Sequence, residues 1–97
     1  MMALRLLLRT HDFLFYANSP ASAALFAAAC RKAGGQGIRS FRMKNGAPCV
    51  DPGTLNRREC QVIFELLRAG VPVTPGTFRR SMSAKHPPQL YVRNRPR

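Results

Sequence analysis

The excess of positive charge is the feature that most limits how this chain can fold. Thirteen arginines and three lysines stand against four acidic residues in 97 positions, which gives a formal net charge of +12. Because four carboxylates cannot neutralise sixteen cations, folding the chain alone brings like charges together. A polyanion relieves that repulsion, and guanidinium binds phosphate through two parallel hydrogen bonds. The composition therefore predicts a nucleic acid as the partner, with structured RNA as the first choice.

The length and the apolar content predict one small domain. Apolar residues make up 45% of the chain, which is too many for a purely disordered basic arm. A chain of this length buries roughly 60–70% of its unfolded surface, so its core is small and a bound partner is expected to add stability. We expect residues 1–82 to form one α+β domain and residues 83–97 to form a basic, proline-containing tail.

The first 35 residues resemble a mitochondrial targeting segment. They carry four basic side chains against one acid, Asp12, and contain Ser19 and Ser22. Arg9 and the polar residues after it interrupt the apolar run, which argues against a secretory signal and a membrane span. The expected location is the mitochondrial matrix, with the segment retained, and the alternative is the cytoplasm.

Two helices are indicated by their end signals. Ser19 can cap a first helix that starts with Pro20, and Gly34 ends it. A second helix is predicted from about residue 55 to residue 69, where Asn56 and Glu59 have the spacing of a capping box. Its apolar stripe consists of Cys60, Ile63, Phe64 and Leu67.

Strands are predicted on either side of the first helix. Residues 3–9 alternate as in a strand, and residues 13–17 form either a second strand or the packed approach to the helix. Residues 38–43 and 47–50 flank a turn at 44–46 and predict a hairpin. Two later segments are also expected to be ordered: a helical turn or strand at 77–82, and an edge strand at 90–92. The order predicts a small ferredoxin-like sandwich of βαββαβ type.

The basic residues gather in three groups that we expect to contact RNA. One flanks the Asn45-Gly46 turn, one lies at the start of the second helix, and one fills the C-terminal third. The predicted contacts are Arg39, Arg42, Lys44, Arg57, Arg58, Arg79, Arg80, Lys85, Arg93, Arg95 and Arg97.

Two of these groups allow more than one interpretation. Phe41, between Arg39 and Arg42, could stack on a base, but burial in the core is the favoured prediction. Arg57 and Arg58 oppose the helix dipole in the first turn, so either a phosphate binds there or they are simply exposed helical arginines.

Catalysis and cofactor binding have little support in the sequence. The four carboxylates do not form a pair at a suggestive spacing, and no nucleophile or phosphate-loop motif is present. The three cysteines are far apart and only two histidines accompany them, so no metal site, cofactor or small-molecule substrate is predicted. Membrane binding is not expected either, because neither predicted helix has a clean basic face opposite large apolar residues.

A DNA-binding regulator is the alternative function. Residues 55–68 followed by 77–82 have some character of a helix-turn-helix, such as a phage-derived regulator would carry. The long connection with two prolines and the very short second helix weigh against it.

The chain resembles organellar ribosomal proteins in its arginine excess, small size, targeting-like start and Pro/Arg tail. More narrowly, it is similar to the small-subunit ribosomal protein six family. The similar segments are LRLLLR (Leu4–Arg9), a helix closing in glycine, GIRSFRMKNGAPCV (Gly37–Val50) and FRRSMSAKH (Phe78–His86). The resemblance implies a βαββαβ fold, contacts with rRNA and with neighbouring ribosomal proteins, and no catalysis.

Overall fold

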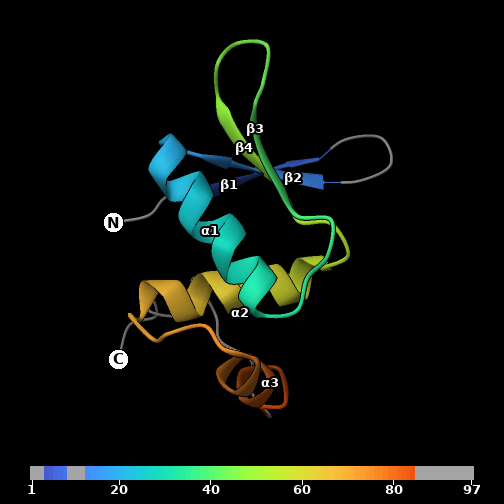
Figure 1. Ribbon diagram of the computed structural model, residues 1–97, viewed down its shortest axis with the longest axis vertical. Coiled ribbons are helices and arrows are strands. Elements are labelled where there is room, and N and C mark those ends of the chain that lie inside the picture. The colour runs from blue at the N-terminus through green and yellow to red at the C-terminus, as the bar shows by residue number, and fades with distance from the viewer. Residues whose placement is uncertain (1–3, 9–12, 85–97) are drawn as a thin grey trace, which may run out of the picture.

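The fold is described from a computed structural model, which describes residues 4–8 and 13–84 of the chain. Four strands and three helices follow one another along these residues (Figure 1). In chain order they are β1 (Leu4–Leu8), β2 (Phe13–Ala17), α1 (Pro20–Lys32), β3 (Arg39–Arg42), β4 (Pro48–Asp51), α2 (Arg57–Arg68) and α3 (Pro75–Met82). The predicted α+β class is confirmed.

The strands form one antiparallel sheet in the order β1-β2-β4-β3. β4 is one of the two inner strands, and its Cys49 lies opposite Tyr16 of β2 on one side and Phe41 of β3 on the other. Because side chains alternate between the two faces of a strand, Tyr16, Cys49 and Phe41 share one face, and their neighbours Phe15 and Val50 share the other.

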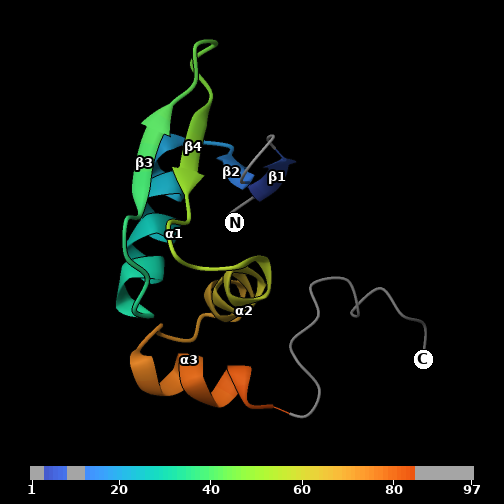
Figure 2. The ribbon, with the colours of Figure 1, turned by 90° about the vertical axis from the view of Figure 1, so that its right-hand side faces the viewer.

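α1 covers the second of these faces, where the hydrophobic core lies. It packs against β2, β3 and β4, and α2 packs against α1 below the end of the sheet (Figure 2). Phe26 of α1 and Ile63 of α2 are fully buried, and the Phe15 ring meets the Phe26 ring edge-on at 5.3 Å between centroids. Small alanines on the buried side of α1 let the helix approach the sheet closely.

The ends of α1 and α2 are where the sequence signals place them. The Ser19 hydroxyl accepts a hydrogen bond from the amide of Ser22, and Gly34 follows α1 with φ of 104°. At α2, Asn56 accepts from the Glu59 amide at 2.8 Å, and the Glu59 carboxylate accepts from the Asn56 amide at 2.7 Å. This capping box confirms the predicted start of the second helix.

The two connections that lead into β3 and out of β4 cross at very short range. Gly53 has φ of 61°, and a Cβ atom there would overlap the carbonyl of Gln36. The Thr54 amide donates to that same carbonyl at 2.9 Å, and the Gln36 amide donates to the Thr54 hydroxyl at 3.0 Å. The glycine-rich segment after α1 therefore ends the helix, as predicted, and also allows two backbone segments to approach closely.

The order of elements differs from the predicted βαββαβ arrangement. Residues 13–17 form a full strand, so a β1–β2 hairpin precedes α1, and the segment after α2 is helical within the described residues. Strand β1 therefore occupies the sheet edge beside β2, and the predicted last strand at 90–92 lies outside the described residues.

The element predicted at residues 77–82 is a helix, α3, and it begins two residues earlier than predicted, at Pro75. Thr74 caps it and exchanges hydrogen bonds with Thr77, and Pro75 occupies the first helical position. α3 ends at Met82, where we expected the domain to end, and nearly all of the predicted tail lies outside the described residues.

Candidate nucleic-acid interface

The β3–β4 hairpin projects from the body of the molecule and carries two cations near its tip (Figure 1). The Gly46 amide donates to the Met43 carbonyl at 2.8 Å, and the Met43 amide donates to the Ala47 carbonyl at 2.9 Å. Lys44 is exposed in this turn, and the Arg42 guanidinium donates to the Gly46 carbonyl at 3.4 Å. The tip is thus rigidly turned by its own backbone and presents positive charge to solvent.

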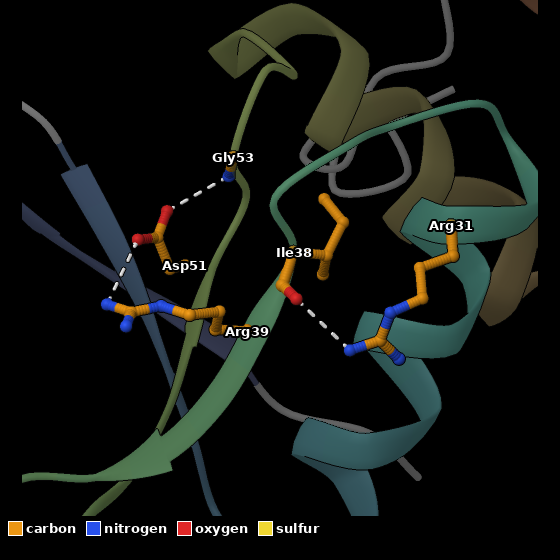
Figure 3. A network of polar contacts seen from close by, with 5 residues as sticks. All are labelled: Arg31, Ile38, Arg39, Asp51 and Gly53. Atoms are coloured by element: carbon orange, nitrogen blue, oxygen red, sulfur yellow. Dashed lines mark hydrogen bonds and ion pairs between the residues drawn. The ribbon is translucent and has the colours of Figure 1, made fainter.

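Arg39 lies on the sheet face away from α1 and has two neighbours there. Its guanidinium is 3.8 Å from the carboxylate of Asp51, directly across on β4, and 5.7 Å from the centre of the Phe41 ring. The Arg39 side chain is nevertheless 72% exposed. Figure 3 shows Arg39 and Asp51 on one side of β3 and Ile38 with Arg31 on the other.

Phe41 does not lie in the core between sheet and helices, which corrects the favoured prediction for it. Alternation along β3 directs Ile38 toward α1 and Phe41 to the opposite face, where Phe41 is half-buried. The prediction was wrong because alternation assigns two faces without saying which of them a helix will cover.

The start of α2 places Arg57 and Arg58 at the surface, but each contacts a group of this chain. The Arg57 guanidinium is 5.9 Å from the centre of the Phe13 ring, and Arg58 donates to the Met82 carbonyl at 3.4 Å. Glu59 completes the cap in the same turn. This carboxylate offsets the unfavourable placement of two cations near the positive end of the helix dipole, so no bound phosphate is needed to explain them.

Arg79 and Arg80 are exposed on α3, which has no buried residue. Both lie in its last turn, close to the Met82 carbonyl that Arg58 reaches. The second and third predicted groups are therefore neighbours: they meet where the start of α2 faces the end of α3.

The predicted basic residues do not form one continuous surface. Figures 1 and 2 place the hairpin tip and α3 at opposite ends of the long axis. The structure therefore joins Arg57 and Arg58 to Arg79 and Arg80, and it keeps this group apart from the hairpin group. The remaining predicted contacts lie outside the described residues: Lys85, Arg93, Arg95 and Arg97.

Cysteine chemistry is confined to the interior of the described chain. Cys30, Cys49 and Cys60 are all buried and none forms a disulfide. A hydrogen bond with the Cys30 thiol and burial between α1 and α2 raise the pKa of Cys60 far above its ordinary value, so this thiol stays protonated. Within residues 4–8 and 13–84, no three potential metal ligands come together, and no helix has the length and apolar character to cross a membrane.

Two residues near the site were not singled out by the sequence. Arg31, at the end of α1, donates to the Ile38 carbonyl at 3.1 Å and ties the helix to the start of β3 (Figure 3). Tyr16 shares the sheet face of Arg39 and Phe41 and is half-buried there. The alternation of residues 13–17 would have revealed Tyr16 once that segment was taken as a strand.

Comparisons with protein-family models, with curated proteins and with solved structures give no match for this chain.

Proposed function

We propose that this protein is a structural RNA-binding component of a ribosome that contacts rRNA phosphates through its arginines and lysines. One observation carries the proposal. Seven of the predicted contact residues lie within the described residues, and all seven are exposed. Among the carboxylates of the described residues, only Asp51 forms an ion pair with one of them, Arg39. The other six are Arg42, Lys44, Arg57, Arg58, Arg79 and Arg80.

The spatial distribution of these cations supports RNA over a single small anion. Two positive groups at opposite ends of a small molecule suit a surface that touches a large folded RNA at several places. Neighbouring ribosomal proteins are the further partners that we propose, because the resemblance of the sequence to ribosomal proteins implies them.

The mitochondrial ribosome is the proposed assembly, and the mitochondrial matrix is the proposed location, with the cytoplasm as the alternative. The support is the resemblance of the sequence to organellar ribosomal proteins and its targeting-like first 35 residues. Residues 13–32 of that segment form β2 and α1, and α1 contributes Phe26 to the core. The segment therefore has to be retained for the domain to fold.

The finer fold assignment is also a proposal. From β2 to α2 the elements read βαββα, which are the first five of the six elements in a ferredoxin-like fold. We propose that this unit is ferredoxin-like and that β1 pairs with β2 at the edge where a final strand would otherwise complete the sheet.

The function is tested by measuring how RNA affinity depends on salt. Binding to a structured rRNA fragment should weaken with rising salt, and each phosphate contact should add about 0.7–0.9 to the log–log slope. Arg42→Gln with Lys44→Gln should reduce both affinity and slope. Arg79→Gln with Arg80→Gln should do the same through the other group, and the tagged protein should co-sediment with ribosomal particles.

A matched lysine supplies the control. Lys32 is exposed like Lys44 but lies at the end of α1, outside both basic groups. Lys32→Gln removes the same charge and should change the slope less than Lys44→Gln does. An affinity that stays constant from low to high salt would rule out phosphate binding. Equal effects of the two lysine variants would show that binding depends on the net charge of the protein and not on the position of Lys44.

DNA binding through α2 and α3 is the second candidate. The two helices are crossed: Figure 1 shows α2 lengthwise and α3 nearly end-on, and Figure 2 shows the reverse. α3 exposes Arg79 and Arg80, as a helix in a major groove would require. Tighter binding to duplex DNA than to RNA, lost in the α3 double variant and kept in the hairpin double variant, would favour this candidate.

A further inference from the structure

We propose that the sheet face turned away from α1 binds unpaired bases of RNA, with the rings of Tyr16 and Phe41 as stacking surfaces and Arg39 as a phosphate contact. This inference rests on the proposed RNA-binding function. It adds the form in which the RNA is bound and the place on the molecule where its bases lie.

The first support is the alignment of two aromatic rings across the sheet. Tyr16 and Phe41 both lie opposite Cys49, on the strands that flank β4. They are therefore two strand spacings apart, about 10 Å, on the same face. Cys49 between them is fully buried, whereas the two aromatic side chains are only half-buried.

The second support is that the described helices pack on the other face and leave Tyr16 and Phe41 partly exposed on this one, although Leu14 and Cys49 beside them are buried. α1 packs against β2, β3 and β4 from the other side, and α2 packs on α1. Antiparallel sheets with aromatic side chains on an open face bind single-stranded RNA by stacking its bases on the rings. In a duplex the bases are already stacked on one another, so this face suits unpaired nucleotides and not a double helix.

The third support is charge. Arg39 lies two residues before Phe41 on β3 and therefore on the same face of the sheet. Its guanidinium lies beside the Phe41 ring, and 72% of its side chain is exposed. β3 then continues to Arg42 and to Lys44 at the tip, so phosphates can follow the strand while bases lie on the face. Two copies of a chain with a net charge of +12 repel each other, which makes self-association a poor use of this surface.

The experiment uses tyrosine fluorescence, because the chain has two tyrosines and no tryptophan. In full-length protein carrying Tyr91→Phe, Tyr16 is the single emitting residue. Titration with oligouridine should quench it, since a stacked base contacts the ring, and an RNA duplex of equal length should bind at least about tenfold more weakly. Tyr16→Leu and Phe41→Leu should each lower oligouridine affinity by roughly 5- to 150-fold, followed by fluorescence anisotropy of a labelled oligonucleotide.

Phe64 provides the matched control. It is a half-buried phenylalanine on α2 with the guanidinium of Arg68 6.0 Å from its ring centre, so it repeats the pairing of Phe41 with Arg39 away from the sheet. Phe64→Leu should leave oligouridine affinity unchanged, and Phe41→Tyr, which keeps a ring, should restore most of it. Circular dichroism and thermal unfolding check that every variant is folded.

Each other outcome overturns the inference in a different way. Equal binding of single strand and duplex, unaffected by Tyr16→Leu and Phe41→Leu, would refute base stacking and leave phosphate binding standing. No binding of either RNA at low salt would refute both proposals. Tighter binding of the corresponding single-stranded DNA would refute RNA as the occupant, and self-association abolished by Phe41→Leu would make the face a contact between copies.

Discussion

The two faces of the sheet use the same strands for opposite purposes. On β2, Phe15 faces α1 and packs on Phe26, while the next residue, Tyr16, faces away, and both side chains are half-buried. On β4, Val50 and Cys49 are both fully buried, yet only Val50 belongs to the core beneath the helices. Both faces thus carry buried side chains, and the position of α1 decides which of them belong to the hydrophobic core beneath the helices.

Removing one phenylalanine from each face tests this difference most directly. Phe26→Ala should lower the free energy of unfolding by about 3–5 kcal/mol, because a fully buried ring leaves a cavity between α1 and the sheet. Phe41→Leu, on the half-buried face, should cost less than about 1.5 kcal/mol. Urea unfolding followed by circular dichroism measures both. Similar losses in the two variants would mean that the second face is packed as tightly as the first.

The pH dependence of the free energy of unfolding tests the packing between α1 and α2, where the Cys60 thiol is buried. The raised pKa of Cys60 means that the unfolded chain loses its thiol proton at lower pH than the folded chain. The stabilisation is complete below the ordinary thiol pKa of 9.0 and is lost as the pH rises above it, by up to about 1.4 kcal/mol per pH unit. Denaturant unfolding between pH 7 and 10 should show this decline.

Cys60→Ala serves as the reference for that series. The variant should be less stable at neutral pH because a buried side chain is shortened, but its stability should fall less steeply above pH 9. Parallel curves for the variant and the natural protein would show that the Cys60 thiol does not control the alkaline decline.

The smallest expected change in stability is at Arg39 and Asp51. Their pair is largely exposed on the arginine side, so Arg39→Gln should change the free energy of unfolding by less than about 0.5 kcal/mol. The same variant should weaken RNA binding. Asp51→Asn retains the oxygen that accepts the Gly53 amide but removes a negative charge from the face, so it should strengthen RNA binding. Equal RNA affinity in both variants would show that no RNA phosphate binds beside the Arg39–Asp51 pair.

Local signals in the sequence predicted the helix ends and the hairpin because each depends on residues only a few positions apart. Ser19, the Asn56–Glu59 capping box and the Asn45-Gly46 turn are of this kind, and each is confirmed. α3 carried a similar signal, with Thr74 and Thr77 around Pro75, but the predicted element began only at residue 77, because prolines also suit an extended connection. Proline at the first helical position loses no hydrogen bond, so it marks a helix start equally well.

Long-range features were beyond the reach of such signals. The place of β1 depends on which sheet edge is free, and that depends on the whole topology. The grouping of Arg58 with the end of α3 likewise depends on how α2 and α3 pack. The candidate site was therefore predicted residue by residue at the hairpin, while its division into two ends and the role of Tyr16 required the structure.

The hairpin that carries Lys44 has a consequence for how this protein could change over evolutionary time. Its turn is closed by its own backbone hydrogen bonds and stands clear of the core, so its length is free to vary. Adding one residue to each strand would move the tip outward by about 3.3 Å, and adding two to each would also preserve which side chains face which way. Its reach could thus be adjusted to the depth of a groove in the partner without any change to the residues that keep the domain folded.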